Sequence, residues 1–90
     1  MIARRFVVRG RVQGVGFRYF AIRAARHSGV VGTVRNLPDG TVEAVAQGPE
    51  DAIAEFFQQL QRGPDFSNVS GVDEFEIPVS GRYKEFNVVY

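Results

Sequence analysis

The sequence contains no cysteine and only one histidine, His27, among its 90 residues. Without cysteine the chain can form no disulfide, no thiolate metal ligand and no cysteine nucleophile. A single histidine argues against a histidine-based metal site. Long hydrophobic runs are also missing, because no apolar stretch approaches the roughly 20 residues of a membrane-spanning helix. No such stretch follows the basic start, Met1 to Arg5, so we expect no signal peptide and a cytoplasmic protein.

Acidic residues are absent from the first 38 positions, which carry eight arginines, whereas all ten carboxylates lie from Asp39 onward. The net charge is only +1. The chain is therefore too balanced for a dedicated nucleic-acid binder, but its basic first half favours an anionic partner. Its length and its 44% hydrophobic content fit one packed domain. We expect a single domain over residues 1–90, and a monomer.

Apolar periodicity divides the chain into strands and helices. Strands are expected where apolar residues alternate, over residues 4–12, 30–36, 41–47, 69–77 and 84–90. Helices are expected over residues 17–28 and 49–62, and glycines follow both. The order β-α-β-β-α-β, with its last part open to division, predicts an α+β, ferredoxin-like split βαβ sandwich. Such a fold has an antiparallel sheet with two helices on one face.

Between the first strand and the first helix lies a loop of six residues, Gln13, Gly14, Val15, Gly16, Phe17 and Arg18. Its glycines let the backbone point successive N–H groups into one concavity, and the helix N-terminus adds free donors. Glycines alone more often mark an ordinary tight turn. Arg18 favours anion binding. A cation in the first helical turn is unfavourable beside the positive end of the helix dipole, and a bound phosphate would compensate because it attracts both. We predict that this loop binds phosphate.

The residues around the loop restrict its chemistry. No Lys-Ser or Lys-Thr pair follows the glycines, and no carboxylates lie near enough in sequence to hold magnesium. The remaining mechanism needs no metal: the loop positions a phosphoryl group and water is the nucleophile. This mechanism suffices only for an activated substrate such as a carboxylic–phosphoric anhydride. Asn36, at the end of the second strand, is the best candidate to position that water. Taken alone, Asn36 is more often a turn-favouring asparagine.

Three stretches of the chain follow a known pattern, namely residues 10–20 (GRVQGVGFRYF), 32–43 (GTVRNLPDGTVE) and 47–50. They resemble the acylphosphatase family. The resemblance implies hydrolysis of acyl phosphates to a carboxylate and inorganic phosphate, without a metal or a cofactor. In it, Arg18 and the loop amides bind the phosphate and Asn36 orients the attacking water. The family commonly has a bulky aromatic where this chain has Thr33, which we interpret as a change in sheet packing near the site.

Two other interpretations stay open. An RNA-binding module shares this order of elements, but Tyr19 and Phe20 fall on a helix rather than on the central strands that carry base-stacking platforms. The chain can also be a regulatory or substrate-delivery domain of a larger carbamoyl-transferring protein. We expect an enzyme with a small acyl phosphate as its substrate, with neither a nucleic-acid nor a membrane partner.

Overall fold

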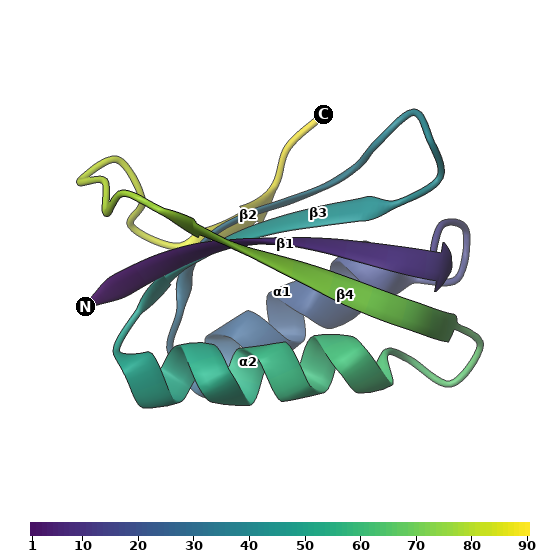
Figure 1. Ribbon diagram of the computed structural model, residues 1–90, viewed down its shortest axis with the longest axis horizontal. Coiled ribbons are helices and arrows are strands. Elements are labelled where there is room, and N and C mark those ends of the chain that lie inside the picture. Colours follow the sequence, from purple (N-terminus) through teal and green to yellow (C-terminus); the bar gives the residue numbers. More distant parts are fainter.

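Five strands and two helices make up the computed structural model, which describes residues 1–90. In chain order the elements are β1 Ile2–Arg11, α1 Phe17–Ser28, β2 Val31–Asn36, β3 Val42–Gly48, α2 Glu50–Arg62, β4 Asn68–Ile77 and β5 Phe86–Val88. The strands lie in the sheet order β4-β1-β3-β2-β5, and both helices cover one face of the sheet (Figure 1). The ferredoxin-like α+β architecture expected from the sequence is confirmed.

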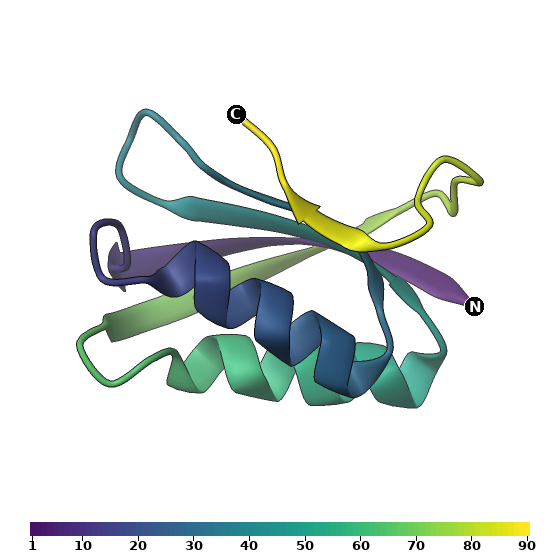
Figure 2. The same cartoon turned by 180° about the vertical axis from the view of Figure 1, so that it is seen from behind.

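The sheet is mixed rather than purely antiparallel, which corrects one detail of the expected fold. β1, β2, β3 and β4 pair antiparallel, but β5 runs parallel to β2. The reason lies in where β4 ends. Ile77 and Gln47 both pair with Ala3, and Gln47 also pairs with Val31, so β4 ends where β2 begins. The chain crosses the sheet at that end and reverses direction there, so β5 runs opposite to β4 and in the direction of β2 (Figure 2).

The two helices begin and end close to the residues that the sequence indicated. Gly29 follows α1 with φ +85°, and its N–H donates a hydrogen bond to the carbonyl oxygen of Ala25. Glu50 and Asp51 occupy the first turn of α2, where their charges favour the helix dipole. The helices have 12 and 13 residues. Neither is long and apolar enough to cross a membrane.

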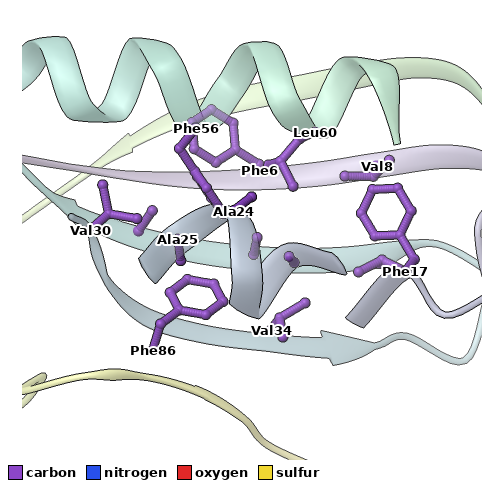
Figure 3. Close-up of a cluster of buried hydrophobic side chains, with 14 of the residues drawn as sticks. Phe6, Val8, Phe17, Ala24, Ala25, Val30, Val34, Phe56, Leu60 and Phe86 are labelled. Atoms are coloured by element: carbon purple, nitrogen blue, oxygen red, sulfur yellow. The ribbon is translucent and has the colours of Figure 1, made fainter. Parts of the chain in front are cut away.

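A core of 17 buried residues lies between the sheet and the helices (Figure 3). Phe6 and Val8 of β1 point into it because alternate strand residues face the helices. The Phe56 ring of α2 packs edge-on against Phe6 at 6.0 Å and against Phe86 at 5.4 Å. Phe56 therefore joins a helix to both a central and an edge strand.

The opposite face of the sheet has no helix over it and carries an ion cluster. Glu43 of β3 accepts hydrogen bonds of 2.7 Å from Nε of Arg5 and 2.8 Å from Nε of Arg35. Burial raises the pKa of Glu43, but the hydrogen bonds and charges of Arg35 and Arg5 outweigh burial and lower the pKa overall. The cluster links β1, β3 and β2. It thereby ties the strand that leads into the predicted loop to the strand that ends at Asn36.

Candidate active site

The loop before α1 and the turn after β2 lie at the same end of the sheet (Figure 1 and Figure 2). Val12 and Phe17, each 1% exposed, anchor the two ends of the loop in the core. Nε2 of Gln13 donates hydrogen bonds of 2.8 Å to the carbonyl oxygen of Leu37 and 2.9 Å to that of Thr41. The Gln13 side chain therefore holds the turn against the loop, a role that the sequence did not suggest.

The backbone of the loop has the conformation that its glycines suggested. Gly14 and Gly16 have φ values of +75° and +79°, in the left-handed region that L side chains rarely adopt. Between Gln13 and Arg18, no backbone N–H donates a hydrogen bond to another group of the chain. The loop and the first turn of α1 therefore present consecutive free donors, which is the arrangement that binds anions.

Ten residues line a pocket of about 270 Å³ beside this loop. Four of the six predicted loop residues are among them, namely Gly14, Gly16, Phe17 and Arg18. Asn36 lines the same pocket from the end of β2. The fold thus brings together the two side chains that the sequence selected for chemistry. The other two predicted loop residues, Gln13 and Val15, do not line the pocket.

Arg18 and Asn36 both keep their polar groups free. Four arginines, Arg4, Arg5, Arg9 and Arg35, have carboxylate partners, whereas Arg18 is one of six that form no salt bridge. The Arg18 guanidinium carbon lies 5.6 Å from the ring centroid of Tyr90. The Asn36 side chain makes no hydrogen bond within the chain, although its backbone is fixed by pairing with Val42. The pocket therefore holds one uncompensated positive charge and one free amide.

The pocket has no side chain that serves as a general base at neutral pH. None of its ten lining residues is Asp, Glu, His, Lys or Cys. No three His, Cys, Asp or Glu side chains gather anywhere in the chain as a metal site requires. Such an arrangement can hold an anion and orient a neutral nucleophile, but it cannot deprotonate that nucleophile.

Five residues that line the pocket were not predicted as site residues, namely Val12, Tyr19, Ile22, Val88 and Tyr90. A signal for two of them was present, because the alternation Phe86, Val88, Tyr90 places these side chains on one face. The sequence could not show which strand β5 would join, and therefore not that its end lies beside Arg18.

Thr33 lies away from the pocket. It pairs with Val45 on the open face of the sheet and borders a separate hollow beside residues 82–85. Asn36 pairs instead with Val42, which is buried under the helices. Thr33 therefore contributes no atom to the pocket lining.

The open face of the two central strands carries no aromatic side chain. β1 presents Ala3, Arg5, Val7 and Arg9 there, and β3 presents Glu43, Val45 and Gln47. Phe75 lies beside this surface on the edge strand β4, where it pairs with Arg5, and the Arg5 guanidinium lies 5.5 Å from its ring centroid. The base-stacking arrangement that the RNA-binding interpretation needs is therefore not formed on β1 and β3.

Comparison with known proteins agrees with this geometry. Residues 4–88 match the acylphosphatase family. An acylphosphatase from Solibacter usitatus is 49% identical over 86 residues, which are 96% of this chain and 88% of that protein. The crystal structure of acylphosphatase from Bacillus subtilis superposes over 100% of both chains, with a TM-score of 0.95 and 40% identity. The structure of T. kodakarensis HypF matches with a TM-score of 0.87 and 34% identity, over only 12% of its own chain. The chain therefore belongs to the acylphosphatase family of hydrolases.

Proposed function

We propose that the chain hydrolyses acyl phosphates to a carboxylate and inorganic phosphate in the pocket between Arg18 and Asn36. Membership of the acylphosphatase family supports the class of reaction. One observation carries the mechanism: an arginine without a carboxylate partner, a row of free backbone N–H groups and a free side-chain amide meet at one pocket. Each of these groups has a distinct task in the reaction.

The phosphate end of the substrate binds the loop. The guanidinium of Arg18 donates two parallel hydrogen bonds to phosphate oxygens, and the free N–H groups of residues 13–18 bind the remaining oxygens. These donors stay fixed during the reaction, because Val12 and Phe17 hold the loop ends in the core. Fixed donors stabilise the charge of the transition state without having to reorganise.

The attacking water binds Asn36. The side-chain oxygen of Asn36 accepts a hydrogen bond from the water and directs a water lone pair toward phosphorus. As the new P–O bond forms, the bond between phosphorus and the acyl oxygen breaks, and its electron pair leaves with the carboxylate. The proton that the water loses goes to a phosphate oxygen or to solvent, because no base lines the pocket. A carboxylate is a weak base, so it leaves without help from a general acid.

The proposal requires no metal ion, because the pocket lining lacks the carboxylates and imidazoles that would bind one. The test is hydrolysis of benzoyl phosphate by the purified chain, with and without excess EDTA. We expect phosphate release at the same rate in both conditions. Loss of activity with EDTA would contradict the metal-free mechanism. No hydrolysis in either condition would contradict the proposed function and favour a domain that only binds or delivers a substrate.

A further inference from the structure

The pocket beside Arg18 has an apolar side that phosphate binding does not use. Ile22 follows Arg18 by one helical turn, so the two side chains lie on the same face of α1. Val88 on β5 and Tyr90 beyond it complete this side. All three line the same pocket as Arg18 and Asn36. We call Ile22, Val88 and Tyr90 the acyl wall.

The framework of the fold holds two members of the acyl wall in place. Val88 pairs with Val34 in the parallel β2–β5 ladder, and the N–H of Val89 donates a 2.9 Å hydrogen bond to the carbonyl oxygen of Val34. Ile22 and Val88 are both half-buried and pack against the hydrophobic core. Their remaining exposed surface faces the pocket, where a ligand can cover it.

Tyr90 contributes an aromatic ring that the fold leaves uncovered. The residue is 100% exposed, although its ring centroid lies 5.6 Å from the Arg18 guanidinium carbon. An exposed aromatic beside a phosphate-binding arginine offers a flat apolar surface to whatever is bonded to that phosphate. Apart from Arg18 itself, no charged side chain lines the pocket.

We propose that the acyl wall binds the acyl group, so that acyl phosphates with extended apolar acyl groups are the preferred substrates. This inference rests on the proposed function. A single oxygen separates phosphorus from the acyl carbon. When the phosphate is bound at the loop, the acyl chain of the same substrate therefore begins within this pocket. Contact with apolar surface stabilises substrate and transition state alike. It therefore lowers KM and leaves kcat nearly constant.

The test compares acetyl, butanoyl and hexanoyl phosphate. Their carboxylates are leaving groups of nearly equal basicity, so the series varies apolar length while the bond that breaks stays the same. We expect kcat/KM to rise about twofold for each added methylene, through KM, because the wall is open to water on one side. In Val88→Thr, which keeps the side-chain volume, and in Tyr90→Ala, this rise should flatten.

Val89→Thr is the matched control, because Val89 borders the separate hollow beside Thr33 rather than this pocket. It should keep the rise with chain length. Equal kcat/KM for all three substrates in the unmodified chain, or an unchanged rise in both acyl-wall variants, would overturn the acyl wall and leave the proposed function standing. Absence of hydrolysis for every substrate would instead overturn the proposed function. If Val88→Thr does not fold, the fully exposed Tyr90 supplies the decisive variant.

Discussion

The side-chain amide nitrogen of Gln13 lies 2.8 Å from the carbonyl oxygen of Leu37 and donates a hydrogen bond to it. This bond joins the loop that contains Arg18 to the turn that follows Asn36. A second bond, of 2.9 Å to the carbonyl oxygen of Thr41, holds the other side of that turn. The relative position of Arg18 and Asn36 therefore depends on a side chain that does not line the pocket.

Replacing Gln13 tests this dependence. Gln13→Leu removes both hydrogen bonds and should lower kcat by about tenfold or more, because a displacement near 1 Å between reacting groups can cost about a hundredfold. Inorganic phosphate should bind nearly as before, since its donors are the loop amides and Arg18. Steady-state hydrolysis of benzoyl phosphate and a phosphate titration measure the two effects. Gln58→Leu, at an exposed position on α2, is the control. Equal kcat values for the two variants would show that Gln13 does not position the site.

Asn36→Ala should separate the chemical step from binding. Without the amide the water is no longer directed at phosphorus, so we expect kcat to fall by about a hundredfold or more. The inhibition constant of inorganic phosphate should change little, because the loop donors remain. The comparison variant is Asn87→Ala, on the exposed strand β5 outside the pocket. Loss of phosphate binding by a folded Asn36→Ala protein would mean that Asn36 binds the phosphate and does not act on the water.

Gly16→Ala tests the conformation of the loop. A Cβ at Gly16 meets no atom within 4 Å, but φ of +79° makes an alanine there strained. We expect a loss of about 1–2 kcal/mol in unfolding free energy, together with weaker phosphate binding if the loop relaxes. Gly81→Ala has equal space and no positive φ, and it should be neutral. Urea unfolding of both variants supplies the measurement. Equal stability of the two would indicate that the loop does not need its left-handed glycine.

The Glu43 cluster should make stability depend on pH. Because the pKa of Glu43 is lowered in the folded chain, its ionised form stabilises the fold above the unfolded-state pKa, near about 4.3 for glutamate. That contribution is lost as the pH falls through the folded-state pKa. The partners Arg5 and Arg35 are 35% and 45% exposed, so water screens the cluster.

We therefore expect Glu43→Gln to be less stable than the unmodified chain at pH 7 by about 1–2 kcal/mol. The difference should shrink as the pH falls toward about 3. Urea unfolding between these pH values measures it. Glu85→Gln, which removes an exposed carboxylate without a salt bridge, should show no such trend. A difference that stays constant across the pH range would contradict the lowered pKa.

Most of the fold could be predicted because its signals are local. The spacing of Ile53, Phe56 and Leu60 places one apolar stripe on α2, and all three are buried. The direction of β5 has no such local signal. It follows from the crossing of residues 78–85, which Gln47 anchors through two hydrogen bonds of 2.7 Å with the backbone of Ser80. A contact between residues so far apart in the chain leaves no periodic pattern.

The site residues also divide into those with a local sequence signal and those placed by tertiary packing. Glycines 14 and 16 indicated the loop because few other residues adopt its backbone, and Arg18 stood out because it opposes the helix dipole. Asn36 was identified by its place at a strand end. Gln13 was predicted only as a backbone donor, and its link to the turn depends on tertiary packing. The nearness of Tyr90 to Arg18 likewise depends on which edge of the sheet receives β5.

The proposed function depends on Arg18 holding the phosphate, and Arg18→Lys changes this contact while keeping the charge. Lysine keeps the charge but cannot supply two parallel hydrogen bonds, so we expect kcat/KM for benzoyl phosphate to fall by about 10² to 10³. Calorimetric titration should show that binding of inorganic phosphate is largely lost. Arg23→Lys, an exposed position on the same helix outside the pocket, should behave as the unmodified chain does. Nearly normal turnover and phosphate binding in Arg18→Lys would show that Arg18 does not hold the phosphate.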